Sequence, residues 1–231
     1  HHIEAGLGFR HERIAEHSRE WEYRDSSGYS MPHNPEALEA IYNLRSNNSI
    51  SSNHLEMYIQ DTWRRETSNS IFSLNYGLRM SHWSWNKEWL FSPRASLTYI
   101  PKNHDNMTIR LATGLYYQRP FYKELRDTIT NGATTIVQLN KDIQSQRSFQ
   151  VIAGYEYRFK LGKRPFLFST ELYYKAQDRL NPYTIDNTKI VYYGRNCATG
   201  NVMGIDLKLY GEFVPGTDSW LTFSLMRARM N

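Results

Sequence analysis

The chain has 231 residues, of which 14% are aromatic, and its 28 basic and 23 acidic residues give a formal net charge of +5. Its mean hydropathy is negative, and no segment approaches the roughly 20 apolar residues of a transmembrane helix, which excludes a helical membrane protein. The basic residues are dispersed among the acidic ones without a basic run, so the composition does not favour nucleic-acid binding.

The N-terminal segment alternates between apolar and polar residues. Ile3, Ala5, Leu7 and Phe9 share one face of a predicted strand, and Gly, Glu and Arg residues occupy the other. A long loop is predicted over residues 22–52.

Two features of the following segment are less regular. Within the predicted loop, Asn34 is expected to cap a short helix whose first residue is Pro35. The second predicted strand, residues 55–63, has Asp61 among its apolar positions. We expect this carboxylate near the edge of a membrane.

Residues 70–99 predict a β-hairpin. Apolar residues occupy the even positions from Phe72 to Met80, and after the connection they occupy the odd positions from Phe91 to Tyr99. A turn centred between Asn86 and Lys87 would pair Leu78 with Ala95 and keep both apolar sets on one face. The polar face would then place Arg79 nearly opposite Arg94.

Five further alternating segments follow, at residues 107–117, 150–159, 168–175, 205–210 and 221–225. In seven of the nine segments the charges lie only on the polar face. Each charge on a lipid-facing position would cost about 2–4 kcal/mol at the bilayer midplane, so this restriction favours strands that cross a membrane. A soluble barrel that binds lipid is the alternative, and it would have an apolar interior.

The lengths of the connections also alternate. Residues 64–69, 101–106, 161–165 and 214–218 form short turns, whereas residues 22–52, the hairpin at Asn86, residues 119–147 and residues 178–199 connect the opposite ends. This asymmetry is typical of an outer-membrane barrel. Aromatic residues at strand ends predict an interfacial girdle; they are Trp63, Tyr99, Phe159, Phe166 and Phe213.

These patterns predict an all-β fold, an antiparallel meander of about nine transmembrane strands that forms part of an outer-membrane β-barrel. We expect every pairing to be antiparallel, with Leu209 opposite Phe223. The sheet should remain open, with free edges near Ile3 and Leu221.

The sequence predicts no enzymatic activity, no cofactor and no metal site. The segment HERIAEH spaces His11 and His17 six residues apart within a predicted strand, whereas a helical zinc site needs two His four residues apart. No nucleophile elbow is present. Cys197 is the only cysteine, which excludes an internal disulfide.

Several segments resemble one family, and their order and spacing carry the resemblance: YIQDTW from Tyr58, LNYGLRM from Leu74, FSPRASLTYIP from Phe91, IRLATGLYYQRPFYKEL from Ile109, QSQRSFQVIAGYEYRF from Gln144 and TGNVMGIDLKLYG from Thr199. Together they resemble the barrel of TonB-dependent outer-membrane receptors, particularly those of Bacteroidetes-type bacteria.

The resemblance implies a 22-stranded barrel with an internal plug, located in the outer membrane of a Gram-negative bacterium. Its implied partners are the membrane lipid, the TonB complex acting through the plug, and an extracellular small molecule or peptide. Residues 1–231 would be part of the barrel domain, without the plug, the first strands or the C-terminal strands. The implied cargo is a scarce nutrient, and FSPRASLTY favours a siderophore, cobalamin, metal chelate or peptide over a glycan. An ungated porin or structural barrel is the second interpretation.

Recognition is expected in the long loops and the adjacent polar face, because strands are fixed by their ladders. Aromatic and cationic groups there suit a chelate, ring or anionic ligand. Self-packing of the loops and membership of the interfacial girdle are equally compatible with these side chains. The candidate residues are Arg79, Arg94, Tyr116, Arg119, Phe121, Tyr122, Lys123, Tyr183, Tyr192, Tyr193 and Arg195.

Overall fold

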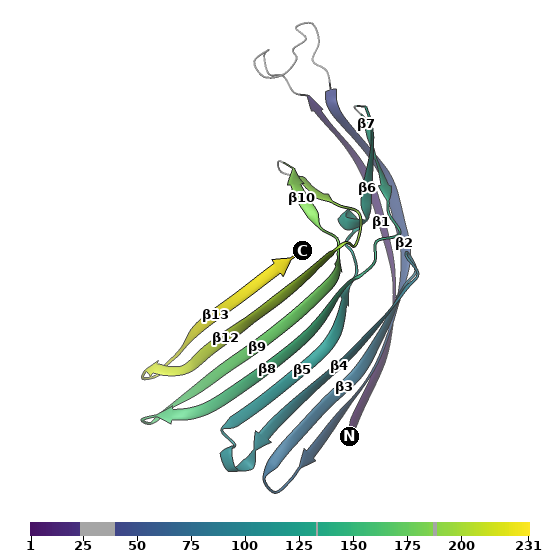
Figure 1. Cartoon of the computed structure of the whole chain (residues 1–231). Coiled ribbons are helices and arrows are strands. Elements are labelled where there is room, and N and C mark those ends of the chain that lie inside the picture. The colour runs from purple at the N-terminus through teal and green to yellow at the C-terminus, as the bar shows by residue number, and fades with distance from the viewer. Residues whose placement is uncertain (24–39, 133, 187–188) are drawn as a thin grey trace.

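The computed structural model describes residues 1–23, 40–132, 134–186 and 189–231, and these form an open, curled β-sheet with two short hairpins at one end (Figure 1). The elements are β1 (His2–Tyr23), β2 (Ala40–Glu66), β3 (Ser70–Trp83), β4 (Glu88–Pro101), η1 (Lys102–His104), β5 (Met107–Gln118), η2 (Tyr122–Leu125), β6 (Arg126–Asn131), β7 (Thr134–Leu139), β8 (Gln146–Leu161), β9 (Arg164–Leu180), β10 (Tyr183–Asp186), β11 (Lys189–Tyr192), β12 (Ala198–Val214) and β13 (Thr217–Met230). No helix in the described ranges is long and apolar enough to cross a membrane.

The nine long strands follow one another as antiparallel neighbours. Their order is β1, β2, β3, β4, β5, β8, β9, β12 and β13. The predicted all-β meander is therefore confirmed. Within the described residues, β1 pairs only with β2 and β13 only with β12, so the sheet is open at both edges.

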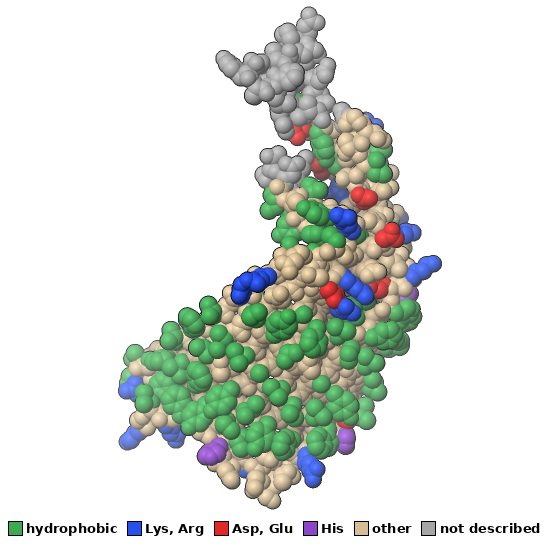
Figure 2. Space-filling view, viewed as in Figure 1, with side chains coloured by type: hydrophobic (Ala, Val, Ile, Leu, Met, Phe, Trp, Pro, Cys, Tyr) green, Lys and Arg blue, Asp and Glu red, His purple; other side chains and the backbone are tan. Residues whose placement is uncertain are grey.

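The two faces of the sheet have the predicted chemistry. Leu7, Leu172 and Phe223 lie on the apolar face and are 74%, 55% and 58% exposed. Figure 2 shows hydrophobic side chains gathered over the lower part of the sheet, below a region rich in charged side chains. Exposure of so many large apolar residues requires a nonaqueous neighbour, because a soluble surface avoids patches of this size.

Asp61 lies on the apolar face, as its position in the alternation predicts. Its Oδ2 accepts hydrogen bonds from the Tyr76 hydroxyl at 2.9 Å and from His1 Nδ1 at 2.7 Å. These neighbours compensate part of the cost of a carboxylate on this face.

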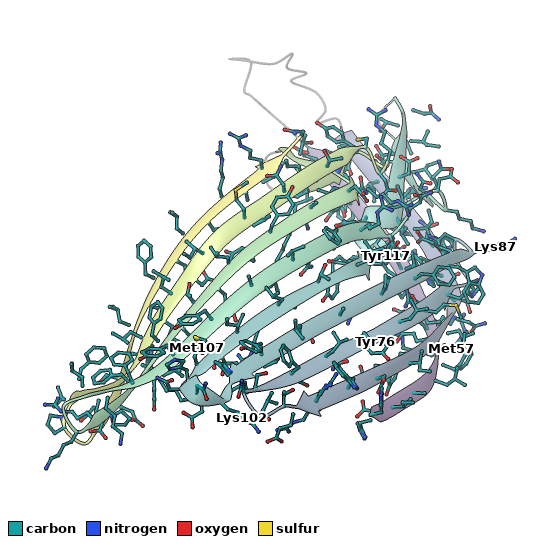
Figure 3. All side chains as sticks on the ribbon, turned by 60° about the horizontal axis from the view of Figure 1, so that its bottom comes forward. Met57, Tyr76, Lys87, Lys102, Met107 and Tyr117 are labelled. Atoms are coloured by element: carbon teal, nitrogen blue, oxygen red, sulfur yellow. The ribbon has the colours of Figure 1, made fainter. Side chains whose placement is uncertain are left out.

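The short turns all lie at one end of the sheet. Lys102 and Met107 mark this end and Lys87 marks the opposite one (Figure 3). Two of the turns are closed by glycine in the left-handed region, with φ of 67° at Gly162 and 73° at Gly216.

Three of the predicted girdle residues pack together near these turns. The ring of Phe166 stacks on Phe159 at 5.6 Å and meets Phe213 edge-on at 5.4 Å. Gly211 lies opposite Phe166 on the neighbouring strand, and the aromatic ring covers the space that its missing side chain leaves.

Both predicted hairpin registers are wrong by two residues. Leu78 pairs with Pro93, so Tyr76 pairs with Ala95. The β3–β4 turn is centred one residue earlier than predicted, because Lys87 adopts the left-handed φ of 58° and Asn86 Oδ1 accepts the Glu88 amide at 3.2 Å. A two-residue shift leaves each side chain on its predicted face.

The second register differs for another reason. Leu209 pairs with Leu221, and Phe223 pairs with Leu207. An irregularity between Gly211 and Val214 changes the offset of the two strands near their turn.

The loop predicted over residues 22–52 is wrong in the described part, because β1 continues to Tyr23 and β2 begins at Ala40. The ladder continues to Glu22 opposite Tyr42. The predicted cap Asn34 and Pro35 lie outside the described residues. This segment has polar residues on both faces, which conceals a strand from a search for alternation.

The loops carry two additional hairpins. β6 and β7 form one of them, and β7 pairs in parallel with β2 from Asn43 opposite Thr134 to Arg45 opposite Ile136. The expectation of antiparallel pairing alone is therefore wrong. β10 and β11 form a separate two-stranded sheet.

A small core forms where the first hairpin meets the sheet. Ile50, Trp83, Leu125 and Ile143 are 1–5% exposed and contact one another. Leu125 and Ile143 belong to the connection between β5 and β8, so this connection is packed against the sheet.

Candidate functional site

A hollow of about 500 Å³ lies on the polar face, between the β1–β2 edge and β5. Its wall includes Tyr58, Asn75, Arg79, Arg94 and Tyr116. Small residues leave this space open, since Gly77 and Ala112 lie on the same part of the sheet. The hollow therefore combines two aromatic rings with two guanidinium groups.

The two arginines of the hollow have different partners. Gly77 lies opposite Arg94, and Ser92 lies opposite Arg79, so the two arginines, which were predicted to lie nearly opposite each other, are diagonal neighbours. Arg79 donates a hydrogen bond to Glu56 Oε2. The pair partly neutralises this side of the hollow.

Arg94 lies over the Tyr116 ring, with its guanidinium carbon 4.3 Å from the ring centroid. It is exposed and forms no ion pair with any described residue. Its N–H groups are therefore available to a carboxylate or phosphate, which guanidinium groups bind in a bidentate manner.

Arg119 belongs to a partly buried polar network above the hollow. Its guanidinium contacts His54 Nδ1 and lies 3.5 Å from Glu56 Oε1, so Glu56 links Arg119 to Arg79. His54 is 4% exposed, stacks on Trp83 at 5.8 Å and contacts Glu12 Oε2 at 3.0 Å. The network joins β1, β2 and β3 to the segment after β5, and its contacts hold Arg119 in place.

Tyr122 attaches the next turn to β1. Its hydroxyl donates to Glu16 Oε2 at 2.6 Å, and Ser46 donates to the same oxygen at 2.7 Å. Arg126 lies 3.5 Å from the other Glu16 oxygen. Burial works to raise the pKa of Glu16, but the hydrogen bonds from Tyr122 and Ser46 and the charge of Arg126 outweigh it, so the pKa lies below its usual value. For Tyr122, burial and the bond to Glu16 both raise the pKa.

The other candidate residues of this loop are accessible. Phe121 is 64% exposed, and Lys123 is also exposed. Both flank Tyr122 in the chain, but their side chains remain free for a ligand.

The candidates of the last loop lie on and beside the β10–β11 hairpin. Tyr183 and Tyr192 are cross-strand partners whose rings meet edge-on at 5.8 Å. Tyr183 and Tyr193 are 52% and 53% exposed, and Arg195 is exposed. This loop thus presents aromatic side chains and one exposed cation.

Asparagine side chains join this hairpin to the loop between β5 and β8. Asn181 Nδ2 donates to the Glu124 carbonyl at 3.3 Å, Asn140 Nδ2 to the Gly194 carbonyl at 3.1 Å, and Asn196 Nδ2 to the Gln144 carbonyl at 3.0 Å. The structure therefore brings together the two loops that the sequence marks as candidates. Burial raises the pKa of Glu124, a residue that is 6% exposed and forms no ion pair with a described residue.

Sequence reasoning missed the acidic half of the site. Glu56 contacts the candidate cations Arg79 and Arg119, and Glu16 accepts the hydrogen bond of Tyr122. Glu12 contacts His54, which lies at the centre of the network. A signal was available, because the glutamates of residues 12–22 all occupy even positions. Among the residues that the structure describes, no group of three His, Cys, Asp or Glu side chains could hold a metal ion.

Comparison with known proteins agrees with this architecture. The family model described as TonB dependent receptor-like, beta-barrel, matches residues 3–230. The chain is similar in fold to the outer membrane transporter YddB from Escherichia coli, with a TM-score of 0.63 and 14% identity over 99% of this chain and 30% of that chain. The chain thus spans about a third of the length of that transporter. No curated protein matches it.

Proposed function

Since the chain belongs to the TonB-dependent receptor-like β-barrel family, we propose that it forms part of the wall of an outer-membrane transporter that imports a scarce nutrient with energy supplied through TonB. The exposed apolar face supports contact with membrane lipid, since charges are rare on it. Strands from the rest of the protein would pair with the free edges of β1 and β13 and close the barrel.

We propose further that the cargo is anionic. The observation that carries this proposal is Arg94, an exposed cation that stacks on Tyr116 in a polar hollow and has no acidic partner among the described residues. A carboxylate-bearing metal chelate, such as a siderophore complex, suits this wall, because one group can bind the guanidinium while a ring stacks on tyrosine. The exposed Phe121, Lys123 and Arg195 would meet the same cargo at the loops.

Uptake by cells that produce the full-length protein tests both parts. Cells with and without a functional TonB complex would be given labelled ferric siderophores that carry either a net negative charge or none. We expect TonB-dependent uptake of the anionic chelate. Uptake that is unchanged when TonB is absent would instead favour the ungated barrel.

Arg94→Gln is the informative variant. A hydrogen bond to a charged group contributes about 1.5–3 kcal/mol, so the concentration for half-maximal uptake should rise roughly 10- to 100-fold. Lys175→Gln is the matched control, because Lys175 also lies over a tyrosine, Tyr173, but outside the hollow. Equal abundance of the three proteins in the outer membrane is required, and equal affinity of all three would contradict the role of Arg94.

A further inference from the structure

The extended β1–β2 hairpin has two faces of opposite charge. β3 ends at Trp83, opposite His54, so the part of β1 beyond Arg10 continues past the neighbouring long strands. In this part of β1, odd-numbered residues are exposed and even-numbered residues are half-buried. The glutamates are all at even positions, and the arginines and histidines are all at odd positions.

The half-buried face has partners within the protein. Glu12 contacts His54, and Glu16 accepts hydrogen bonds from Tyr122 and Ser46. Its acidic residues thus hold the loop between β5 and β8 against the hairpin. The opposite face is turned away from these contacts.

The exposed face is a cationic stripe, which we define as His11, Arg13, His17, Arg19 and Arg45. Between these residues lie small or neutral polar side chains: Ala15, Asn47, Ser49, Ser51 and Asn53. No acidic residue of the described part of the hairpin beyond Arg10 lies on this face, and Arg13, Arg19 and Arg45 form no ion pair with a described residue.

Two of these arginines are placed unfavourably in the absence of an anion. Arg19 and Arg45 are direct cross-strand partners, so their side chains leave the sheet side by side on the same face. Like charges in this position repel and destabilise a sheet. A phosphate or carboxylate that binds both would turn this repulsion into attraction.

The position of the stripe indicates what kind of anion it could bind. It is the direct continuation of the apolar face, since Leu7 and Phe9 occupy the preceding odd positions and are 74% and 70% exposed. At about 3.3 Å per residue, Arg13 lies roughly 13 Å and Arg19 roughly 33 Å along the strand from Phe9. With a tilt of about 45°, these distances correspond to roughly 9 Å and 23 Å above the apolar band.

We propose that the cationic stripe binds the phosphate groups of a glycolipid in the outer leaflet of the membrane. Such a lipid has its acyl chains beside Leu7 and Phe9, the phosphates next to its acyl chains beside Arg13, and the phosphates of its core sugars beside Arg19 and Arg45. A protein partner fits less well, because interface cores are enriched in aromatic residues and this face has none between Phe9 and Trp21. A strand added to the free edge of β1 would lie beside the stripe and leave it uncovered.

Binding of a defined glycolipid to the full-length protein in detergent tests the proposal. The probes are a glycolipid that carries phosphates both on its lipid A and on its core sugars, and the same glycolipid after removal of all its phosphates. Each cation near an anionic surface contributes roughly fivefold in affinity, so the triple variant R13Q/R19Q/R45Q should bind the phosphorylated glycolipid about 10- to 100-fold more weakly. The dephosphorylated lipid should bind wild type and variant equally.

Two further variants keep the test specific. R13K/R19K/R45K retains the charges and should retain most of the affinity. R64Q/R65Q/K163Q removes three exposed cations from the short-turn end and should bind like wild type. The proposal is overturned by unchanged binding in R13Q/R19Q/R45Q, by an equal loss in R64Q/R65Q/K163Q, or by equal binding of both lipids to wild type. It requires an outer-membrane location but no particular cargo, so loss of the transport proposal leaves it intact.

Discussion

The contact between Tyr122 and Glu16 gives the sharpest test of how the loop between β5 and β8 is held. Tyr122→Phe removes the 2.6 Å hydrogen bond and leaves the ring in its place beside the core of Ile50 and Leu125. A hydrogen bond to a charged group contributes about 1.5–3 kcal/mol, and we reduce this to about 1–2 kcal/mol because the Glu16 side chain is 19% exposed. Ser46 still donates to the carboxylate.

Hydrogen exchange of the full-length protein measures this change. Local opening that costs about 1–2 kcal/mol less should accelerate exchange of the loop amides roughly 5- to 30-fold. Asn140 is a suitable reporter, because its amide donates to the Leu125 carbonyl at 2.7 Å. Amides of β8 and β9 should exchange as in wild type.

The control is Tyr193→Phe, since Tyr193 is 53% exposed and its hydroxyl has no hydrogen-bond partner among the described residues. It should leave every exchange rate unchanged. If Tyr122→Phe did the same, the hydroxyl would contribute nothing to loop attachment. Because the folded pKa of Glu16 lies below the ordinary 4.5, its contribution is present above pH 4.5 and is lost as pH falls through the folded pKa.

Two other substitutions test separate parts of the structure. Gly211→Val should lower the yield of folded, heat-modifiable protein, because the new Cβ would lie 2.7 Å from the Pro165 carbonyl oxygen and against the Phe166 ring. The control Gly154→Ala should fold with the yield of wild type, because its new Cβ would meet no atom nearer than 3.7 Å. Normal folding of Gly211→Val would refute the argument. Glu124→Gln should slow hydrogen exchange of the η2 amides at neutral pH and leave it unchanged at acidic pH. Because the pKa of Glu124 in the folded protein is raised, the loop has its full stability below the ordinary carboxyl pKa of 4.5 and loses stability as the pH rises through the folded pKa. Faster exchange at neutral pH would show that ionised Glu124 stabilises the loop.

Alternation was sufficient to predict the membrane-facing part of the fold. Lipid restricts one side of every strand, so residues such as Leu78 and Leu97 could be assigned to the apolar face from the sequence alone. The register could not be assigned with the same precision. When a turn is displaced by one residue, the partner of every residue in the hairpin changes by two positions. Each side chain then stays on the same face of the sheet, so the alternation of apolar and polar residues is the same for both registers.

The upper part of β1 and β2 was missed because the hydrocarbon of the membrane, which selects apolar side chains, does not act on it. Beyond Arg10 the residues that alternate are acidic and basic rather than apolar and polar, so hydropathy shows no period there. Charge has the period of two that hydropathy lacks, with Glu16 and Glu20 at even positions and Arg13 and Arg19 at odd ones. A search for alternating charge would have extended the strand.

Burial divides the candidate recognition residues in a way that residue type alone does not. Arg119 and Tyr122 are engaged by His54 and Glu16, whereas Phe121 and Lys123 are exposed between them in the chain. Deletion of the whole loop would also remove Leu125 and Ile143 from the core and would uncover Ile50 and Trp83. Loss of uptake after such a deletion would therefore report damage to the wall as readily as loss of a binding site. Only substitutions at exposed positions of this loop separate recognition of a cargo from the packing that holds the loop in place.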